Sequence, residues 1–463
     1  MINLSDFKSI HCIGIGGVGL SAIAEILLAR GYKVSGSDMK ESDITDRLRA
    51  QGAEIYIGHR AENVENADLV IYSAAIFDEN PEMVRAREKH AVLAGRAEIL
   101  GILMDEFENS IAISGTHGKT TTTSMVSLIL DNAKLDPTIL VGGNLAEIGG
   151  NVRVGGSSFF VTEACEYRDS FLELRPMTEV ILNIDSDHLD YFKDIDHIVR
   201  SFKRFTENIK RGGKLIAYDS NPFLSGIIKE IPQTITYGYN GNSVYSISDI
   251  TFSHTGMPSF DVSYKGQHLG RAELNVPGEH NILNATAAFA CCHQMGVSPE
   301  VIIDTLGKYT GTQRRFDVQG TTGKGVTVVD DYAHHPTEIR ATLSAAQNIP
   351  HGRLWCLFQP HTYTRTLALM DEFAEAFSDA DILILADIYA AREKNIYKVT
   401  SETLAESIKT HHPDKDVRYM KDFREMADFV EANAKAGDLV ITMGAGDIFK
   451  VGRMIMDDDG EEE

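Results

Sequence analysis

The amino-acid sequence predicts an α/β protein of three domains, each with a parallel or mixed sheet covered by helices. The chain has 463 residues, which is too long for one ordinary hydrophobic core. Apolar strand-like runs alternate with amphipathic helical segments along the whole chain, as in α/β proteins. Two glycine-rich loops, Gly14–Gly19 and Gly115–Gly118, each follow a strand and open a helix, which is typical of nucleotide-binding domains.

Composition and cysteine usage indicate a soluble protein. Hydrophobic residues make up 43% of the chain and charged residues 24%, as in globular proteins. The sequence has no apolar window of membrane-spanning length and no basic, apolar signal segment at its start. Its 5 cysteines contain no Cys-x-x-Cys pair, which favours reduced thiols. We therefore expect a cytoplasmic location and no membrane partner.

The charge balance argues against nucleic acid as a partner. The chain has 67 acidic and 44 basic residues, a net charge of −23, and lacks the basic patch of a nucleic-acid-binding protein. Anionic ligands must therefore be bound by local groups such as loop amides, metal ions and a few arginines. The segment Asp457–Glu463 is acidic at six of seven positions and is expected to be a solvated tail.

The first segment, residues 1–105, contains a dinucleotide-binding pattern. A strand is expected over Ser9–Ile15, followed by a glycine turn, a helix over Leu20–Arg30 and a strand over Tyr32–Ser37 that ends at Asp38. The pattern suits a diphosphate at the helix end and a ribose at the carboxylate. A nicotinamide dinucleotide and a nucleotide diphosphate fit it equally well. Further strands are expected over Glu54–Ile57 and Leu69–Tyr72.

The second segment, residues 106–317, alternates strands and helices and then changes character. Expected strands cover Ile111–Ser114, Phe159–Glu163, Val180–Ile184 and Lys214–Tyr218, and one helix presents Ile198, Phe202, Phe205 and Ile209 on a single face. Residues 234–276 alternate polar and apolar positions between turns, which predicts a small inserted antiparallel meander. A helix over Asn281–Gln294 follows.

The third segment, residues 318–463, is predicted to form another α/β unit that begins near Gly325. Its expected strands are Val326–Asp330, Leu354–Phe358, Ile382–Ala386 and Leu439–Met443. Amphipathic helices lie between them, which favours a sheet covered on both faces.

The loop after Ile111–Ser114 is expected to bind phosphate. Its backbone N–H groups and the positive helix end face an anion, Lys119 adds a charge, and Thr120 can hold Mg²⁺. A strict Walker pattern requires a glycine where this chain has Ile113. A surface turn with a chance Gly-Lys-Thr is the alternative, but the strand–loop–helix context favours use of a nucleoside triphosphate.

Polar residues at the carboxyl ends of the expected strands are candidates for chemistry, because open α/β sheets bind ligands there. The oxygen-rich groups suit Mg²⁺ better than zinc, whereas helix capping or surface exposure would explain Glu163 and His188 without function. The set comprises Glu163 and Glu166; Asp185, Asp187, His188 and Asp190; Arg314-Arg315; Asp330–Pro336; and His361 and Arg365.

Taken together, these motifs resemble those of the Mur ligase family over nearly the whole chain. The motifs that carry the resemblance are Gly14–Gly19, Gly115–Thr121, Glu163–Glu166, Asn183–Asp190, Pro277–Asn281, Arg314–Phe316, Asp331–Pro336, Phe358–Arg365 and Met443–Asp447. The resemblance implies a three-domain ligase with Rossmann-like N- and C-terminal domains and a central ATPase domain. Members of this family lack the first glycine of the strict Walker pattern, so the resemblance also accounts for Ile113 at that position.

The resemblance implies a specific activity in peptidoglycan precursor synthesis. This is the ATP-dependent joining of L-alanine to the lactyl carboxylate of UDP-N-acetylmuramate, through an acyl phosphate. The N-terminal domain would bind the UDP-sugar, the central domain ATP and the C-terminal domain the amino acid.

The resemblance also implies site residues. The UDP-sugar would be bound by Gly16, Gly17, Val18, Gly19, Asp38, His59 and Ser73. ATP would be bound by Gly115, Thr116, His117, Gly118, Lys119, Thr120, Thr121, His280, Asn281, Asn284, Arg315 and Asp331. L-alanine would be bound by Tyr332, His334 and Arg365, and Mg²⁺ by Thr120, Glu163 and His188. The expected catalytic residues are Lys119, His188, Arg315 and His334, and either histidine could remove the proton of the alanine amine.

Two departures from the family pattern leave roles open. Cys165 interrupts the usual acidic run beside Glu166, and Thr362 stands where many members carry a basic residue.

A ligase that attaches a whole tripeptide is the nearest alternative function. A nicotinamide-dependent dehydrogenase would explain the first glycine loop but not the second, and a non-catalytic ATP-binding protein is a third alternative. Monomer and weak homodimer both remain open.

Overall fold

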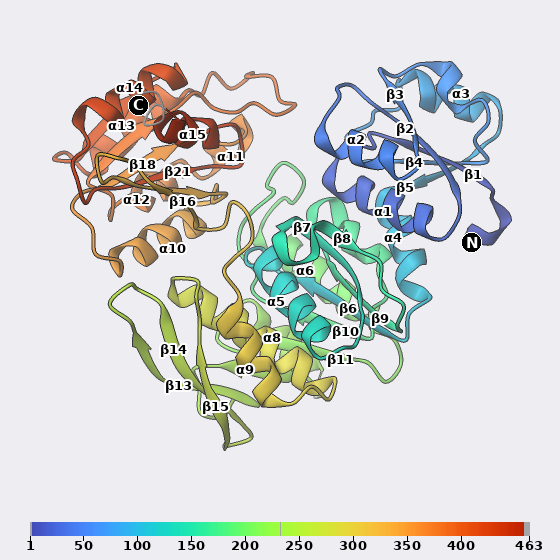
Figure 1. The fold of residues 1–463 in the computed structure, drawn as a ribbon, viewed down its shortest axis with the longest axis horizontal. Helices are drawn as coiled ribbons and strands as arrows, with labels where there is room; N and C mark the ends of the chain where they lie inside the picture. Colours follow the sequence, from blue (N-terminus) through green and yellow to red (C-terminus); the bar gives the residue numbers. More distant parts are fainter. Residues whose placement is uncertain (1, 232, 458–463) are drawn as a thin grey trace.

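A computed structural model of the chain describes residues 2–231 and 233–457. The acidic tail expected over Asp457–Glu463 lies, beyond its first residue, outside these described residues. Three sheets follow one another along the chain, and Figure 1 shows them as three packed α/β segments. This confirms the predicted α/β class. Within the described residues, no helix is both long and apolar enough to cross a membrane.

The N-terminal sheet is parallel throughout, with strand order β3-β2-β1-β4-β5. Helix α1 begins two residues earlier than expected, because Gly17 adopts the extended N-cap conformation and Val18 is already helical. The elements are β1 (Ser9–Ile13), α1 (Val18–Ala29), β2 (Lys33–Asp38), α2 (Asp43–Ala50), β3 (Glu54–Ile57), β4 (Leu69–Tyr72), α3 (Pro81–Glu88), β5 (Val92–Gly95) and α4 (Arg96–Asp105).

The central sheet has ten strands in the order β15-β14-β13-β12-β11-β10-β6-β9-β7-β8. Its first half comprises β6 (Asn109–Ser114), α5 (Lys119–Asn132), β7 (Thr138–Leu145), β8 (Gly150–Arg153), β9 (Phe159–Glu163), β10 (Thr178–Ile181), α6 (Ile195–Thr206) and β11 (Lys214–Tyr218). Its second half comprises α7 (Leu224–Glu230), β12 (Ile235–Gly238), β13 (Tyr245–Phe252), β14 (Pro258–Tyr264), β15 (Gln267–Glu273), α8 (Glu279–Gln294) and α9 (Pro299–Lys308).

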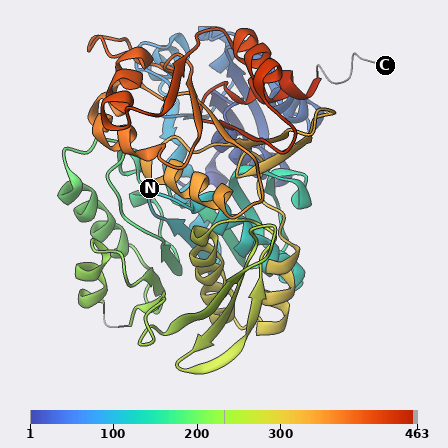
Figure 2. The ribbon, with the colours of Figure 1, turned by 90° about the vertical axis from the view of Figure 1, so that its left-hand side faces the viewer.

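The expectation of a separate antiparallel meander over residues 234–276 needs correction. Strand β12 pairs in parallel with both β11 and β13, so the turn at Asn240-Gly241 does not form a hairpin. Within residues 234–276, antiparallel pairing is confined to β13–β15, and these strands extend the central sheet to the lower edge of the molecule in both views (Figures 1 and 2). Their alternating pattern arises because one face packs on α8 and α9 while the other faces solvent.

The C-terminal sheet has the order β16-β17-β21-β18-β19-β20, and only its edge strand β16 is antiparallel. Two apolar clusters cover its two faces. Its elements are β16 (Asp317–Thr321), β17 (Thr327–Asp331), α10 (Pro336–Gln347), β18 (Leu354–Phe358), α11 (Tyr363–Ala368), α12 (Met370–Ala376), β19 (Ile382–Leu385), α13 (Ser401–His411), β20 (Asp416–Tyr419), α14 (Phe423–Asn433), β21 (Leu439–Met443) and α15 (Phe449–Asp457).

Hydrophobic packing joins the N-terminal and central segments. One buried cluster contains Leu100 and Leu103 of α4 together with Phe160 of β9 and Phe171. Burial of such large apolar side chains is the main stabilising term of an interface. The contacts between the central and C-terminal segments that bear on function are polar instead, and they surround the phosphate loop.

Candidate functional site

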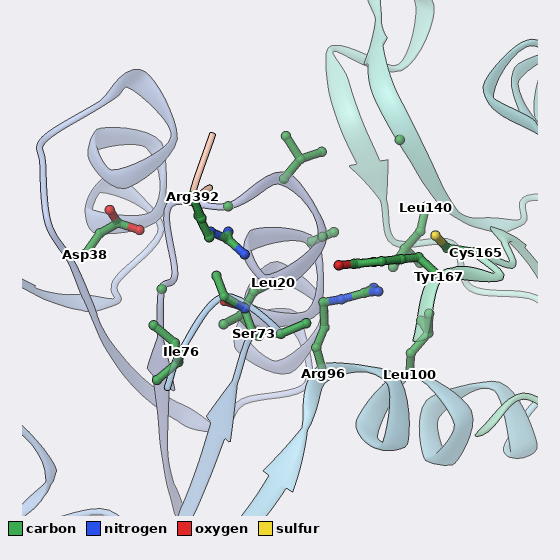
Figure 3. Close-up of a pocket in the computed structure, with 18 of the residues that line it drawn as sticks. Leu20, Asp38, Ser73, Ile76, Arg96, Leu100, Leu140, Cys165, Tyr167 and Arg392 are labelled. Atoms are coloured by element: carbon green, nitrogen blue, oxygen red, sulfur yellow. The ribbon is translucent and has the colours of Figure 1, made fainter. Parts of the chain in front are cut away.

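The first part of the site is a cavity of about 960 Å³ between the N-terminal and central segments. The first glycine loop forms one wall, and the middle of β7 and the end of β9 form another (Figure 3). Six of the seven residues expected to bind the UDP-sugar line it: Gly17, Val18, Gly19, Asp38, His59 and Ser73. Gly16 does not line the cavity, but its N–H donates to Oδ2 of Asp38 at 2.9 Å.

A buried carboxylate fixes one of these residues, His59. Oε2 of Glu82 lies 2.8 Å from Nδ1 of His59, and it also accepts a hydrogen bond from the Ser37 hydroxyl at 2.7 Å. Burial opposes the charge of Glu82, but hydrogen bonds hold its pKa at about 2. The carboxylate therefore favours a proton on Nδ1 and fixes the orientation of the His59 ring, as the second partner of a histidine commonly does.

The second part is the phosphate loop, which runs from the end of β6 into α5. Gly118 has φ of 87°, and a side chain there would collide with the Asn284 amide, so glycine is required on both grounds. The N–H of His117 donates to the side chain of Asn183 at 2.8 Å. The loop is therefore held at the carboxyl ends of β6 and β10, where anions bind in open α/β sheets.

Lys119 forms a buried ion pair within this loop. Its Nζ lies 3.0 Å from Oε2 of Glu166 and also donates to the carbonyls of Gly115 and Thr116 at 2.5 and 3.0 Å. Burial lowers the pKa of the ammonium, but the charge of Glu166 outweighs this effect and raises it. The lysine is therefore charged and positioned over the loop carbonyls.

The expected magnesium ligands are Thr120, Glu163 and His188, and His188 lies close to this ion pair. Oε1 of Glu163 accepts a 2.5 Å hydrogen bond from the N–H of Gly142, and a side chain on the next residue, Gly143, would meet Thr120. Nε2 of His188 lies 3.9 Å from Oε1 of Glu166. A carboxylate and a hydroxyl beside a phosphate loop fit the oxygen preference of Mg²⁺.

A different group of side chains offers three possible ligand atoms for a metal ion within 4.8 Å of one another. Among the described residues it comprises His117, Asp185 and His335. His117 is already bonded on both ring nitrogens, to Asp185 and Glu338, each at 3.2 Å. Burial lowers the pKa of His117, but these two carboxylates outweigh it and raise the pKa to about 9. The imidazole is therefore protonated and unsuited to metal binding at neutral pH.

The third part is a cavity of about 130 Å³ between the central and C-terminal segments. Eight of the twelve residues expected to bind ATP line it: His117, Gly118, Thr121, His280, Asn281, Asn284, Arg315 and Asp331. Burial lowers the pKa of His280 to about 4, so its imidazole is neutral and able to stack or accept a hydrogen bond. Burial raises the pKa of Asp331 to about 6, against the opposing charge of Arg315.

The fourth part is a cavity of about 690 Å³ whose lining comes from all three segments. Of the residues expected to bind alanine, Arg365 lines it, whereas Tyr332 and His334 do not. Nδ1 of His334 instead lies 2.9 Å from the carbonyl oxygen of Tyr332. Burial lowers the pKa of His334 to about 3, which makes it a weak base.

Arg365 is bound to the central segment by an ion pair with Asp187. Its Nη2 lies 2.9 Å from Oδ1 of Asp187, and its Nε donates to the same oxygen at 3.0 Å. Burial raises the pKa of Asp187, but Arg365 and nearby histidines outweigh it and hold the pKa well below its ordinary value. His361 also lines this cavity, and burial lowers its pKa to about 4.

Sequence reasoning missed several residues at these cavities. Arg96, Tyr167 and Arg392 line the first cavity, and Tyr389 and Glu393 line the fourth. Arg96 begins α4 and was detectable as a basic residue at a helix start. The others lie on irregular segments outside recognisable motifs, so nothing in the pattern of the sequence identified them.

The first and fourth cavities share four lining residues, Ala74, Phe77, Tyr167 and Arg392. They are therefore adjacent parts of one hollow between the three segments. Both cavities reach the Lys119–Glu166 pair. The first does so where Glu163 lines it, and the fourth where Asp187 and His188 line it. Groups bound in the separate cavities can thus meet at the phosphate loop.

Comparison with known families gives matches along most of the chain. Three family models match in order: the Mur ligase family catalytic domain over residues 9–108, the Mur ligase middle domain over residues 113–292, and the Mur ligase glutamate ligase domain over residues 314–446. The UDP-N-acetylmuramate–L-alanine ligase of Alkaliphilus metalliredigens (strain QYMF) is 51% identical over 452 residues, 97% of each chain.

Solved structures of ligases also match this chain over nearly its whole length. The UDP-N-acetylmuramate-alanine ligase of Thermotoga maritima is similar with a TM-score of 0.83 and 28% identity, over 99% of this chain and 100% of the other. A murein peptide ligase of Psychrobacter arcticus 273-4 has a TM-score of 0.73 and 24% identity, over 98% of this chain and 99% of the other. The second likeness concerns the fold alone.

Proposed function

The chain belongs to the Mur ligase family, and we propose that it joins L-alanine to the lactyl carboxylate of UDP-N-acetylmuramate with consumption of ATP. The observation that supports this best is the similarity to relatives that carry this name: two of them are 51% and 49% identical over 97% and 99% of this chain. The adjacent cavities support it further, since the reaction must bring a nucleotide sugar, a triphosphate and an amino acid to one point. The reaction belongs to the synthesis of peptidoglycan precursors.

We assign one substrate to each segment. Residues 1–105 would bind the UDP-sugar at the first glycine loop, residues 106–317 would bind ATP at the phosphate loop, and residues 318–463 would bind L-alanine. The cavity lined by Asp38, His59 and Ser73 supports the first assignment. The cavity lined by His280, Asn281 and Asp331 supports the second.

The first chemical step would be phosphoryl transfer. An oxygen of the lactyl carboxylate attacks the γ-phosphorus in line, the bond to the β-phosphate oxygen breaks, and an acyl phosphate and ADP form. Lys119 and Arg315 would reduce the repulsion between the two anions and stabilise the charge that moves to the leaving oxygen. The ammonium of Lys119 can turn from the loop carbonyls to phosphate oxygens that bind in front of them.

The second step would form the amide bond. The alanine amine attacks the acyl carbon, a tetrahedral intermediate forms, and inorganic phosphate leaves with one former carboxylate oxygen. The amine must lose a proton, and His188 suits this step better than His334, whose lowered pKa makes it a weak base. Packing of the C-terminal segment over the site would exclude water from the acyl phosphate.

Thr120, Glu163 and His188 would hold Mg²⁺, which supplies charge neutralisation to the phosphate oxygens when bound. The hydrogen bond from the N–H of Gly142 to Oε1 of Glu163, beside the phosphate loop, supports this assignment for Glu163. His188 has two proposed roles, as a metal ligand and as a base. One ring nitrogen cannot fill both roles at the same moment, because a metal-bound nitrogen cannot accept a proton.

We also propose that the protein acts in the cytoplasm. All five cysteines are free in the structure, and the proposed reaction consumes ATP. Reduced thiols are the normal state in that compartment.

Release of phosphate from ATP tests the proposed function. The full-length protein is mixed with Mg²⁺, ATP and UDP-N-acetylmuramate, and each of a panel of amino acids and the tripeptide is added in turn. Phosphate release that depends on the UDP-sugar and is fastest with L-alanine supports the proposal. Faster release with the tripeptide would instead identify a tripeptide-attaching ligase.

A further inference from the structure

We propose that Arg392, a residue of the C-terminal segment, binds the diphosphate of the UDP-sugar inside the cavity of the N-terminal segment. This inference rests on the proposed function for the identity of the ligand. Arg392 lines both the 960 Å³ cavity and the neighbouring 690 Å³ cavity. The loop that carries it follows β19 and extends from its own sheet toward the N-terminal segment (Figure 1).

The loop around Arg392 is anchored on both sides. Before it, the N–H of Tyr389 donates to the carbonyl of Pro360 at 2.8 Å, and the N–H of Thr362 donates to the carbonyl of Tyr389 at 2.9 Å. After it, the carboxylate of Glu393 accepts the N–H of Thr364 at 2.9 Å. The position of Arg392 is therefore set by the start of α11 rather than left to a free loop.

The backbone immediately before Arg392 adopts an unusual conformation. Ala391 has φ of 51°, a left-handed conformation that is unfavourable for a residue with a Cβ atom. A residue is kept in such a conformation only where its surroundings require it, and these residues cluster at ligand sites. Here the conformation turns the chain between two anchors and presents the arginine to the cavity.

Within the described residues, the guanidinium of Arg392 forms no ion pair or hydrogen bond, although the protein carries a net charge of −23. Elsewhere, arginines such as Arg314, Arg353 and Arg365 pair with carboxylates. Arg96, the other arginine of the cavity, is also unpaired within the described residues. Arg392 is exposed and Arg96 is half-buried, so both guanidinium groups are open to a ligand in the cavity, and a guanidinium suits the oxygens of a phosphate.

The carboxylates of the cavity do not replace that ligand. Asp38 accepts the N–H groups of Gly16 and Met39, at 2.9 and 2.7 Å, and Glu163 accepts that of Gly142. Glu79 also lines the cavity, but it is exposed and forms no ion pair with Arg392. The positive charge therefore remains available to a ligand.

The position of the guanidinium points to the diphosphate rather than to the lactyl carboxylate. In Figure 3 Arg392 reaches down over Ser73, on the side of the first glycine loop, whereas Arg96 extends toward Tyr167 and Cys165. The lactyl carboxylate must lie at that second end, next to the phosphate loop. The diphosphate belongs at the glycine loop and the start of α1, where N–H groups bind phosphate.

Binding measurements with matched variants of the full-length protein test the inference. Arg392→Gln removes the charge, and Arg392→Lys retains it. Lys394→Gln removes one charge from the same loop at an exposed residue that lines neither cavity. Calorimetry gives the Kd values of UDP-N-acetylmuramate, UDP and ATP, and thermal unfolding verifies that each variant is folded.

Arg392→Gln should weaken UDP-N-acetylmuramate and UDP equally, by roughly 10- to 100-fold, because a charge-assisted contact is lost. ATP affinity should stay within about twofold of wild type, Lys394→Gln should have no effect, and Arg392→Lys should recover part of the loss.

Unchanged UDP affinity in Arg392→Gln overturns the inference, as does an equal loss of ATP affinity. A loss confined to UDP-N-acetylmuramate would assign Arg392 to the lactyl carboxylate and overturn the diphosphate assignment. Failure of the wild-type protein to bind UDP-N-acetylmuramate would instead contradict the proposed function.

Discussion

Nζ of Lys119 lies 3.0 Å from Oε2 of Glu166, and both side chains are largely buried, with 16% and 3% of their surfaces exposed. The lysine belongs to the phosphate loop and the glutamate to the segment after β9, so the pair links two adjacent strand ends. This contact gives Glu166 a role that its sequence context left open. It holds the charge of Lys119 at the phosphate loop.

Lys119→Ala is predicted to lower kcat by about 10²–10³-fold, because one electrostatic group of the transition state is lost. It should also lower stability by about 3–5 kcal/mol, since the buried Glu166 loses its partner. The double variant Lys119→Ala/Glu166→Gln should regain most of the stability but none of the rate. Steady-state kinetics and denaturant unfolding measure both quantities. A double variant with restored turnover would show that Lys119 has no catalytic role.

His117 is predicted to stabilise the contact between the central and C-terminal segments in a pH-dependent way. Its pKa is raised to about 9 by Asp185 and Glu338, against about 6.5 in an unfolded chain. The folded state therefore binds the proton more tightly, so the stabilisation is complete below about pH 6.5 and is lost as pH rises through about 9.

Comparison with His117→Gln measures this effect. The wild-type protein should exceed the variant in free energy of unfolding by about 1–3 kcal/mol at pH 6.5, and the difference should shrink toward pH 9.5. His254→Gln, at an exposed histidine of the β13–β14 turn, serves as the control and should show no such trend. A difference between wild type and His117→Gln that does not change with pH contradicts the assignment.

His188→Ala separates the two roles proposed for this histidine. If His188 binds Mg²⁺, the variant should need a higher Mg²⁺ concentration for half-maximal rate. If His188 accepts the amine proton, the Mg²⁺ requirement stays unchanged and the pH–rate profile loses the limb that reports its deprotonation. Measuring rate against both Mg²⁺ and pH distinguishes these outcomes, and a variant equal to wild type would reject both roles.

Arg365→Ala is predicted to raise the KM for L-alanine much more than those for ATP and the UDP-sugar. The physical reason is that Arg365 lines the cavity of all three segments, and a guanidinium suits a carboxylate. Arg340→Ala is the matched control, because Arg340 is exposed on α10 and donates to the carbonyl of Glu372 at 3.4 Å. Equal changes in the three KM values would indicate that Arg365 acts through Asp187 as a structural contact alone.

Much of the fold was predictable from sequence because its strands are buried and apolar. Strands β3, β4, β9, β11, β18 and β21 have the bounds that the sequence predicted. The missed strands β5, β7, β8, β16 and β20 are short, edge-lying or rich in glycine and charge, so their periodicity carries little signal. The parallel pairing of β12 with β13 depends on tertiary context that the local turn signal at Asn240-Gly241 does not contain.

The candidate site was predictable where it consists of motifs and not where it consists of contacts between segments. The glycine loops placed Asp38 at the end of β2 and Lys119 at the start of α5, because both positions depend on local strand–loop–helix geometry. The pairing of Arg365 with Asp187 joins residues far apart in the chain, and spacing alone cannot reveal it. The same reason explains why Arg392 was not identified.

Isotope transfer in a single reaction mixture tests the central claim most directly. The lactyl carboxylate of UDP-N-acetylmuramate is labelled with ¹⁸O, and the full-length protein receives it with ATP, Mg²⁺ and L-alanine. Mass spectrometry of the products should find the alanine amide of the UDP-sugar and one ¹⁸O atom in the released phosphate, since an acyl phosphate transfers that oxygen. Unlabelled phosphate, or absence of the alanine amide, would contradict the account.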